Sequence, residues 1–482
     1  MFISDKIYIP VSQIGRQIVD ICNLFTYQNP EYYIKKRQKF SVKNISPSLY
    51  NYKLETINNE QHLVLPRGCL QKLYSYLNEK NLHFRILDDR ILKDPIDVKL
   101  VNTNLEQQQH TIVELLCKNE GGLIEASPGG GKTISILAFI AKIKQPALIL
   151  VHEAFLQEQW LGEMEKRLGG NFKTGRWDMR HKTRGDIDIG LLPSVYKQVE
   201  NDNTFLDHYG IIVLDETHRC PAPTFLKVMN TAKCKYRVGV TGTVERKDEM
   251  HLLTYDVLGE KLISISAGDL KHRITSFEVE IIPTDLSIEL PTVLRWNPKI
   301  KEREKAIDIA KTITLLTNNL KRNNIIIKKI VEHINAGYFP LVLSDRVDHV
   351  KLIDFRLKEL GYSTVTLLGN VRSKKKYNWE ELREDFSIQC VIASTKKAEE
   401  GLDWPRLSAI HLTCPSSNMP KIKQRIGRVR RRCEGKLKPI VCDYVDNLAY
   451  FINSEQEIVH ILKYGARKRI RFYNKLQEDY DE

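Results

Sequence analysis

The chain has 482 residues, and its 74 Lys and Arg outnumber its 60 Asp and Glu to give a formal net charge of +14. Hydrophobic residues make up 42% and charged residues 28% of the chain, which excludes a fully disordered or collagen-like protein. At roughly 100–200 residues per domain, the length predicts two to four domains. The positive charge favours a polyanionic partner, but by itself it does not separate DNA from RNA or from an anionic membrane.

The N-terminus and the cysteines both indicate a cytosolic protein. Residues 1–14 mix charged residues and a proline into their apolar residues, so we predict no secretory signal. No window approaches the roughly 18 consecutive apolar residues of a transmembrane helix. The nine cysteines are odd in number and include no C-x-x-C pair. We therefore expect neither a zinc site nor a disulfide framework, but reduced thiols and a cytoplasmic location.

Residues 1–95 differ in pattern from the rest of the chain. Short runs of alternating polarity, Lys6–Ile9 and His62–Leu65, stand among many aromatic residues. Alternation predicts half-buried strands, so we expect a small α+β domain. A basic and aromatic stretch in it either contacts nucleic-acid phosphates and stacks on bases, or is a solvated helix end. Its residues are Tyr32, Tyr33, Lys35, Lys36, Arg37, Lys39 and Phe40.

Two sets of short apolar runs without alternation follow, with helical patterns between them. Such runs are typical of strands buried on both faces, and strand–helix alternation predicts parallel sheets flanked by helices. The predicted fold class is α/β, with one lobe at 96–285 and another at 286–482. The predicted strands are Gly122–Ala126, Pro146–Val151, Gly210–Leu214, Tyr236–Thr241, Pro340–Ser344, Cys390–Ser394, Leu407–Leu412 and Pro439–Tyr444. The predicted helices are Thr133–Lys144, Glu153–Leu168 and His349–Leu360.

Two charged segments border the second lobe. Asp285–Gly337 is strongly charged and helical in pattern, and we expect it to lead into that lobe. The basic tail of the chain either extends a nucleic-acid track or forms an amphipathic helix that packs on the lobe. Its basic residues are Lys463, Arg467, Lys468, Arg469, Arg471 and Lys475.

A glycine-rich loop joins the first predicted strand of the first lobe to a helix. Glycines let backbone N–H groups surround phosphate oxygens, and the helix N-terminus adds partial positive charge. Lys132 would reach the β- and γ-phosphates of a nucleotide, and Thr133 would hold Mg²⁺. The alternative is a chance glycine-rich turn, but the strand–loop–helix context favours nucleotide binding. After Ala126, the candidate residues are Ser127, Pro128, Gly129, Gly130, Gly131, Lys132 and Thr133.

An acidic pair, Asp215 and Glu216, directly follows a predicted strand. Carboxylates at the C-terminal end of a strand face the ligand crevice of an open α/β sheet. Asp215 would bind Mg²⁺ directly or through water, and Glu216 would polarise the attacking water. The alternative is a helix N-cap, but the position of the pair downstream of Lys132 favours the catalytic interpretation.

A dense arginine run, Gln424–Arg431, lies in the second strand set. The planar guanidinium matches phosphate oxygens, and arginines opposite a phosphate loop can stabilise the charge that develops in phosphoryl transfer. By itself the run is more simply a solvated basic face or an RNA-binding patch. Together with the phosphate loop and the acidic pair, it favours a catalytic role.

In order and content, these motifs resemble those of superfamily 2 helicases, and most nearly the XPB/UvsW-like group of DNA translocases, over residues 105–445. The resemblance makes Gln109 the adenine-reading glutamine, Ala126–Thr133 motif I, and Asp215–His218 a motif II of the DExH type. Leu150–Trp160 resembles motif Ia.

Later motifs extend the resemblance. Thr241–Thr243 occupies the place of the Ser/Thr-Ala-Thr motif, with glycine in the middle. Arg246–Asp248 replaces the Arg-Glu-Asp of XPB-like proteins with a reversed central charge. Leu341–Arg346 resembles motif IV. Motif V implies roles for Gly401 and Asp403. Motif VI includes Gln424 and makes Arg428 and Arg431 the candidate arginine fingers.

The N-terminal region resembles the small DNA-binding domain of UvsW-like phage helicases, through Leu65–Leu70. The overall resemblance implies two RecA-like lobes, ATP and Mg²⁺ as ligands, and an ATP-dependent DNA helicase or translocase with 3′→5′ polarity that acts on branched DNA. It also leaves open a transcription or transcript-release role of XPB-like or poxviral type, an RNA helicase, and a non-catalytic scaffold, which the intact motifs argue against.

The resemblance and the composition also suggest the oligomeric state and the cellular location of the protein. The residues for both sides of the ATP cleft would be present in one chain, so we expect a monomer. We also expect no membrane partner. The Lys-, Asn- and Ile-rich composition fits a phage or a large DNA virus, which would place the protein in the host cytoplasm.

Overall fold

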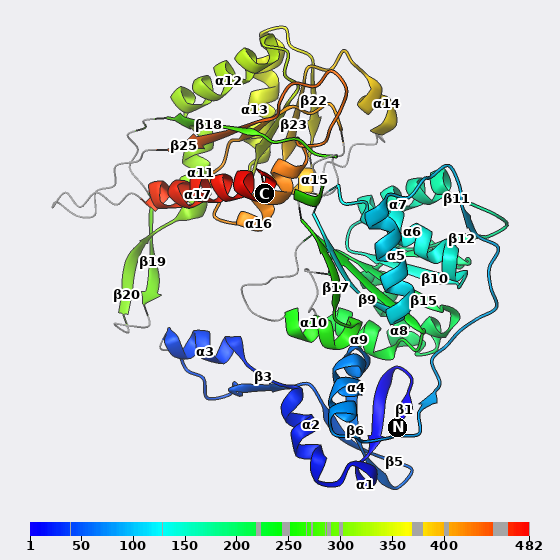
Figure 1. The fold of residues 1–482 in the computed structure, drawn as a ribbon. Coiled ribbons are helices and arrows are strands. Elements are labelled where there is room, and N and C mark those ends of the chain that lie inside the picture. Colours follow the sequence, from blue (N-terminus) through cyan, green and yellow to red (C-terminus); the bar gives the residue numbers. More distant parts are fainter. Residues whose placement is uncertain are drawn as a thin grey trace. The chain divides into compact units, whose positions relative to one another are not determined.

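The chain forms two compact units, Met1–Ile265 and Ser266–Glu482. The computed structural model describes most of both units (Figure 1). The positions outside the described residues are 39, 128, 218–222, 243–250, 267, 271–272, 285, 287–290, 298–301, 369–378, 400–403, 447–460 and 482. None of the described helices is long and apolar enough to cross a membrane.

The first unit begins with a small, largely antiparallel sheet in the order β5-β6-β2-β1-β7. Alternation places Ile7 and Ile9 of β2 opposite Leu65 and Leu63 of β6, and all four side chains are fully buried. The predicted alternating strands are therefore confirmed. The strands are β1 (Phe2–Ile3), β2 (Lys6–Pro10), β5 (Lys53–Ile57), β6 (Glu60–Pro66) and β7 (Leu87–Asp88).

Helices and a separate ribbon complete this N-terminal region. The helices α2 and α4 contribute Ile21 and Leu73 to the same apolar core, whereas α3 buries none of its residues. The helices are α1 (Val11–Ile14), α2 (Ile18–Leu24), α3 (Pro30–Arg37) and α4 (Leu70–Glu79), and the ribbon pairs β3 (Thr26–Gln28) with β4 (Ser48–Tyr50).

The main sheet of the first unit has the strand order β13-β12-β14-β10-β15-β16-β9-β17. All neighbours are parallel except β12 and β13. Every residue of β10 and β15 is buried, which confirms the prediction of strands covered on both faces. The strands are β9 (Gly121–Ala126), β10 (Ala147–Val151), β12 (Thr174–Trp177), β13 (Lys182–Thr183), β14 (Ile187–Leu191), β15 (Ile211–Asp215), β16 (Tyr236–Thr241) and β17 (Lys261–Ile265).

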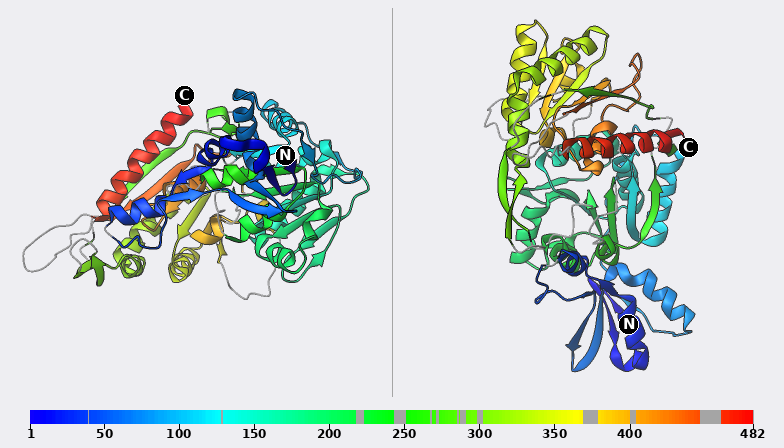
Figure 2. Two further views of the ribbon diagram at one scale, coloured as in Figure 1. Left: turned by 90° about the horizontal axis from the view of Figure 1, so that it is seen from below. Right: turned by 90° about the vertical axis from the view of Figure 1, so that its left-hand side faces the viewer.

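Helices flank this sheet (Figure 2), and the same unit also contains a separate two-stranded ribbon. The helices are α5 (Gln107–Asn119), α6 (Lys132–Ile143), α7 (Ala154–Arg167), α8 (Leu192–Asn201), α9 (Pro223–Thr231) and α10 (His251–Leu258), and the ribbon pairs β8 (Lys99–Leu100) with β11 (Leu168–Gly169).

The N-terminal region packs directly on the main sheet and its helices. The Arg67 guanidinium is buried and donates to the backbone carbonyls of Cys234 and Lys235. A Cβ atom at Gly68 would collide with the backbone of Tyr255 and Asp256. Close backbone approach therefore requires glycine in the turn that precedes α4, which explains why the Arg67-Gly68 step stands out in the sequence.

The second unit contains a fully parallel sheet in the order β18-β25-β24-β21-β23-β22. The unit starts at Ser266 rather than at residue 286 because β18 pairs with β25. Its strands are β18 (Glu278–Pro283), β21 (Pro340–Ser344), β22 (Thr364–Leu367), β23 (Cys390–Ser394), β24 (Ala409–Leu412) and β25 (Ile440–Val445). Its helices are α11 (Ile309–Asn318), α12 (Leu320–Asn335), α13 (Val347–Glu359), α14 (Trp379–Glu384), α15 (Thr395–Glu399), α16 (Met419–Gly427) and α17 (Ile461–Asp481).

The helical prediction for Asp285–Gly337 is wrong in its first half. Residues 292–307 form an antiparallel hairpin of β19 (Thr292–Asn297) and β20 (Glu302–Ile307). Charge density suggested helix, but the Thr, Val and Trp residues of β19 favour a strand. The second half is helical as predicted, in α11 and α12.

The basic tail forms α17, and one face of that helix packs on the second lobe. Arg469 is 3% exposed, and its guanidinium contacts the Asp443 carboxylate at 2.7 and 3.0 Å. The Tyr473 hydroxyl donates to the same carboxylate at 2.9 Å. The packing interpretation of the tail is therefore confirmed, whereas a nucleic-acid track along its exposed basic face stays a prediction.

Candidate nucleotide and nucleic-acid site

The glycine-rich loop lies where sequence reasoning placed it, between β9 and α6. Gly131 is the N-cap of α6 with φ 72°, and Gly129 has φ 89°. Both values fall in the left-handed region that glycine adopts without strain. No side chain caps the helix, and its first turn holds no acidic residue. The first N–H groups of α6 can therefore serve an anion.

Two backbone hydrogen bonds hold the loop against its own sheet. The Ser127 N–H donates to the carbonyl of Ile265 in β17 at 3.0 Å, and the Gly130 N–H donates to the Ser127 carbonyl at 2.9 Å. Ser127 is 5% exposed, so this side of the loop is fixed by the protein. Pro128, which we also predicted to line the site, lies outside the described residues.

Lys132 opens α6 and its side chain turns back over the loop. Its Nζ donates to the carbonyl of Ala126 at 2.7 Å. On the other side, a Cβ atom at Gly242 would lie 3.9 Å from the same Nζ. Gly242 follows β16, the strand between β9 and β15. The ammonium therefore lies at the C-terminal edge of three adjacent strands.

Asp215 ends β15 at the same edge and is nearly buried. Its Oδ2 accepts a hydrogen bond from Trp160 Nε1 at 2.9 Å, and its Oδ1 accepts one from the Glu216 N–H at 2.9 Å. Burial and the negative charge of Glu216 raise the pKa of Asp215 to about 6, against the opposing effects of Trp160 and of the Lys132 charge. The Lys132 charge and the two hydrogen bonds favour the ionised carboxylate, which can hold a cation.

Glu216 adopts a left-handed conformation, with φ 55°. Such a backbone is uncommon for a residue with a side chain and clusters at functional sites. The parallel register pairs Asp215 with Val240 and Thr241 with Glu125. These pairings bring the ends of β15, β16 and β9 level, so the acidic pair and the glycine-rich loop share one edge.

Gln109 lies near the start of α5 and is 2% exposed. Its Oε1 accepts from the Glu106 N–H at 2.9 Å as part of a capping box. Its Nε2 has no hydrogen-bond partner within the described part of the chain. A buried amide donor without a partner is costly, and a ring nitrogen of a nucleobase is an acceptor that would satisfy it.

In the second unit, the arginine run begins in the last turn of α16 and continues past its end. Arg428 is the C-cap of that helix, and Arg431 forms a β-bridge with Ile274. Gln424, Arg428 and Arg431 are all partly exposed, and Arg431 lines a hollow of about 700 Å³. These three side chains can therefore reach a ligand.

Arg430 has a different role from its neighbours. It is 4% exposed, its Nε donates to the Thr275 carbonyl at 2.9 Å, and its guanidinium lies over the rings of Phe277 and Tyr480. The arginine run thus contains one buried residue, Arg430, which stands in the sequence between the partly exposed Arg428 and Arg431.

Comparisons with known proteins agree with this geometry. The family described as type III restriction enzyme, res subunit, matches residues 101–246, and the helicase conserved C-terminal domain matches residues 321–433. "Probable helicase D10" of Escherichia phage T5 is 26% identical over 77% of this chain and 77% of its own. The chain is a superfamily 2 helicase of the XPB/UvsW-like group. As a helicase it binds nucleic acid and hydrolyses ATP.

Two further likenesses concern the relatives and the fold of this helicase. "DNA 3'-5' helicase XPB" of Kineococcus radiotolerans is 23% identical over 68% of this chain and 57% of its own. A solved structure, "S. cerevisiae Dbp5 bound to RNA and ADP BeF3", covers 79% of this chain and 88% of that one with a TM-score of 0.51 and 14% identity. The second likeness shows the fold alone, two RecA-like lobes.

Several predicted motif residues of the helicase lie outside the described residues. They are Pro128 of the phosphate loop, His218 of the acidic motif, Thr243, Arg246–Asp248, and Gly401 and Asp403 of motif V.

The structure also adds contacts that sequence reasoning missed. Trp160 was recognised only as the end of a motif, but its indole bonds Asp215 across 55 positions. Gly242 was noted as a departure from the family pattern, but it lies next to Lys132. Neither contact has a signal in local spacing, because each joins segments that only the folded sheet brings together.

Proposed function

We propose that this helicase is an ATP-dependent 3′→5′ DNA translocase that remodels branched DNA, in branch migration or at forks and D-loops, during recombination, repair or replication. The observation that carries the motor part is the shared edge on which Lys132 and Asp215 lie close enough for the lysine to lower the pKa of the carboxyl group.

In this proposal, the first lobe holds the nucleotide. Ser127, Pro128 and the glycines 129–131 surround the phosphates, Lys132 neutralises their charge, and Gln109 bonds the base through its free Nε2. Thr133 and Asp215 supply the hard oxygen ligands that Mg²⁺ prefers. The ion would polarise the phosphoryl oxygens, while Glu216 orients the attacking water.

The second lobe supplies the opposite wall when the lobes close. Arg428 and Arg431 would stabilise the charge that develops on the phosphoryl group, and we assign Gln424 to catalysis and Gly401 and Asp403 to nucleotide binding. Closure in the presence of ATP and release after hydrolysis would move the lobes along one strand. Both walls belong to one chain, so we propose a monomer.

The N-terminal region, residues 1–95, is proposed to grip DNA as a domain separate from the ATP-binding lobe and from the second lobe. In α3, Tyr33, Ile34 and the neighbouring Phe40 are each more than two-fifths exposed beside basic side chains. Exposed rings and cations suit bases and phosphates. Grip through the backbone implies weak sequence specificity and steep salt dependence.

The names of the relatives support DNA as the substrate and 3′→5′ as the direction of movement. They also leave other roles open. The Kineococcus relative is named a 3′-5′ DNA helicase. A Schizosaccharomyces pombe relative is a subunit of a general transcription and DNA repair factor, which favours a role in transcription or transcript release as the second candidate. A mimivirus relative carries the name of an RNA helicase. Phage and virus relatives suggest that the protein works in a host cytoplasm.

The decisive experiment compares substrates side by side. Full-length protein is given ATP and Mg²⁺ with forked, four-way and linear duplex DNA, with 3′- and 5′-tailed duplexes, and with matched RNA. The Lys132→Ala variant is the negative control. The proposal predicts ATP-dependent processing of forks and four-way junctions above linear duplex, from 3′ tails. Preference for RNA, or for 5′ tails, would reject it, and ATP-dependent release of RNA from a stalled transcription complex without junction processing would favour the second candidate.

A further inference from the structure

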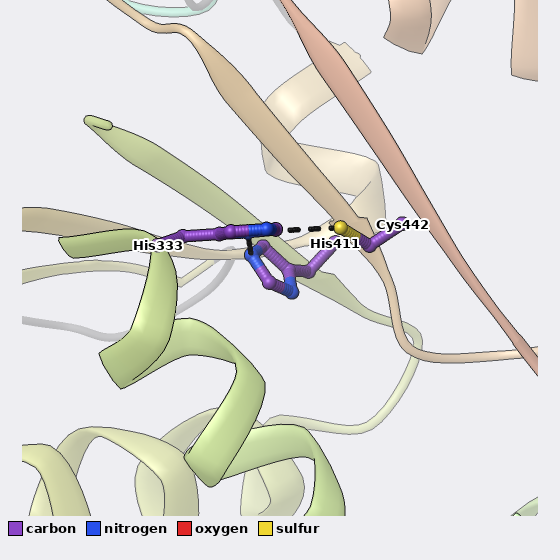
Figure 3. A group of neighbouring side chains, drawn as sticks. All are labelled: His333, His411 and Cys442. Carbon is purple, nitrogen blue, oxygen red and sulfur yellow. Dashed lines mark hydrogen bonds between the residues drawn. The ribbon is translucent and has the colours of Figure 1, made fainter. Parts of the chain in front are cut away.

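A buried cluster of nitrogen and sulfur ligands lies in the second lobe, outside every motif of the helicase. His333, His411 and Cys442 are all buried, and one ligand atom of each lies within 4.8 Å of the others. Figure 3 shows the two imidazoles and the thiol side by side, with His333 joined to both other residues by dashed lines. The proposed ATPase chemistry uses none of the three side chains.

The parallel register of the sheet creates the cluster. Cys442 of β25 pairs with His411 of β24 on one side and with Glu280 of β18 on the other. Paired residues on adjacent strands point to the same face. The helix α12 contacts this sheet and directs His333, in its last turn, at the row. The ligands thus come from three rigid elements.

Two of the three ligand–ligand distances match those of a tetrahedral zinc site, and the third, from Cys442 to His411, is within 4.8 Å. Zn–N bonds of about 2.05 Å and a Zn–S bond of about 2.3 Å give tetrahedral edges of about 3.3 Å between two nitrogens and about 3.6 Å between nitrogen and sulfur. His333 Nδ1 lies 3.1 Å from His411 Nε2, and Cys442 Sγ lies 3.7 Å from His333 Nδ1. Both measured edges agree with the ideal values to within about 0.2 Å.

The second nitrogen of each imidazole has an outer partner. His333 Nε2 lies 3.3 Å from Glu280 Oε2, and His411 Nδ1 lies 2.8 Å from the Tyr444 hydroxyl. Metal-bound histidines commonly donate their other N–H to a carboxylate or another oxygen, which fixes the tautomer and orients the ring. Glu280 is itself held by Lys329. This arrangement leaves His333 Nδ1 and His411 Nε2 free to face a cation.

We propose that His333, His411 and Cys442 bind a Zn²⁺ ion whose fourth position is taken by water, with Glu280 and Tyr444 as the outer partners that orient the two imidazoles. The ion would tie α12 to β24 and β25 and so stabilise the second lobe. Its two positive charges would be balanced by the Cys442 thiolate and the nearby Glu280 carboxylate, which removes the cost of burying an unpaired charge.

A chain of hydrogen bonds is the metal-free alternative. Tyr444 can donate to His411, His411 to His333, and His333 to Glu280, and burial lowers the pKa of both histidines so that each carries one proton. Burial and Glu280 raise the pKa of Cys442, so in this state the thiol keeps its proton. Binding of Zn²⁺ releases the thiol proton to solvent, while His411 stays neutral because its one proton moves from Nε2 to Nδ1, where it is donated to the Tyr444 oxygen.

The test measures metal rather than helicase activity. Full-length protein without an affinity tag is purified, dialysed against a weak chelator and analysed for zinc, and it is also loaded with Co²⁺. We expect one zinc per chain, a rise in the thermal midpoint with Zn²⁺, and absorption from a cobalt–thiolate bond. Cys442→Ser should lose all three. Cys390→Ser is the matched control, because Cys390 is equally buried in the same apolar cluster and should keep them.

The wild-type protein decides the question even if Cys442→Ser does not fold. No zinc and no cobalt–thiolate absorption in wild-type protein would establish the hydrogen-bond chain and overturn the proposal. Zinc that survives Cys442→Ser but is lost in Cys433→Ser, at an exposed thiol, would place the metal elsewhere and overturn it as well.

Discussion

Lys132 and Asp215 illustrate how single residues acquire their chemistry from the edge of a sheet. The lysine lies between the Ala126 carbonyl and Gly242, and the carboxylate is enclosed by Trp160 and the Glu216 N–H. The opposite charges stabilise each other, whereas the burial and the charge of Glu216 oppose ionisation of Asp215. The predictions at this scale concern these four side chains.

Replacement of Lys132 by alanine should abolish ATP turnover while DNA binding stays largely intact. The ammonium is the cation at the helix N-terminus of the loop, and loss of one preorganised donor to a developing charge costs at least about 10²-fold in rate. Turnover and DNA affinity are measured on the same preparation. Lys142→Ala, at an exposed position of the same helix, is the control, and normal turnover in Lys132→Ala would refute the assignment.

Replacement of Glu216 by glutamine should trap ATP without hydrolysis. The amide keeps the shape of the side chain but cannot accept a proton, so turnover should fall by about 10²–10⁴-fold while ATP affinity is kept. Loss of the neighbouring charge should also lower the pKa of Asp215, because Glu216 raises it. ATP retention on a filter and steady-state turnover test this, with the exposed Glu165→Gln as control. A variant that hydrolyses ATP normally contradicts the role of general base.

Replacement of Trp160 by phenylalanine should shift the acid limb of the pH profile upward. Trp160 lowers the pKa of Asp215, which stands at about 6, so its loss raises that pKa. Only the ionised carboxylate holds Mg²⁺, so kcat/KM for ATP falls as pH drops through this value. A charge-assisted hydrogen bond of about 1.5–3 kcal/mol corresponds to a shift of about one to two pH units.

Trp177→Phe is a matched control for the tryptophan experiment. Its indole donates to the buried Asp188 at 2.8 Å in the same sheet, so it loses a similar contact away from the phosphate loop. The acid limb should stay in place in this variant. Equal shifts in both variants would mean that general destabilisation, and not Asp215, controls the profile.

At the scale of elements, burial of charged side chains determines how peripheral segments attach. Arg67 anchors the N-terminal region through backbone carbonyls, and Arg469 anchors α17 through Asp443. In both cases a residue type usually found at the surface is buried because its partners satisfy it. The basic tail therefore contains both buried and exposed arginines, since Arg469 is buried and Arg471 is exposed.

Replacement of Arg469 by alanine should destabilise the second lobe by about 3–5 kcal/mol, since it leaves the Asp443 carboxylate buried without its cation. Denaturant unfolding and protease sensitivity of the C-terminal segment measure the effect. The exposed Arg471→Ala should change stability by less than about 0.5 kcal/mol. If the two variants proved equally stable, α17 would not be held by this pair.

At the scale of the whole molecule, the proposed motor depends on two units that are each complete folds. The first unit carries the glycine-rich loop and the acidic pair, and the second carries the arginine run. Neither unit has both halves of the proposed site. The proposed mechanism therefore needs both units, and the arginines should matter for turnover more than for nucleotide binding.

Replacement of Arg428 or Arg431 by alanine should lower turnover by about 10³–10⁵-fold with ATP affinity nearly unchanged, because a finger acts on the charge that develops during transfer. The exposed Arg432→Ala should be close to wild type, whereas Arg430→Ala should lose stability, since Arg430 is buried. Nucleotide binding and turnover are compared across the four variants. Full turnover in both Arg428→Ala and Arg431→Ala would refute the proposal that the second lobe supplies arginine fingers.

Local signals in the sequence determined the parts of this protein whose chemistry is contiguous. The buried strands, the loop Ser127–Thr133 and the acidic pair each occupy one short segment, and the pattern of apolar residues and glycines was sufficient to place them. The charged hairpin at 292–307 was missed, because charge density by itself says little about the choice between helix and strand.

Tertiary structure alone decided the contacts that join distant segments. Strand order brought Gly242 beside Lys132 and Trp160 to Asp215, and strand register put His411 and Cys442 in one row beneath His333. No spacing rule predicts these groups, because their members stand 31 to 110 positions apart, from 442 minus 411 to 242 minus 132. Neighbouring strands of a parallel sheet are joined by long crossover connections. Residues that share an edge or a face of the sheet are therefore close in space but far apart in the sequence.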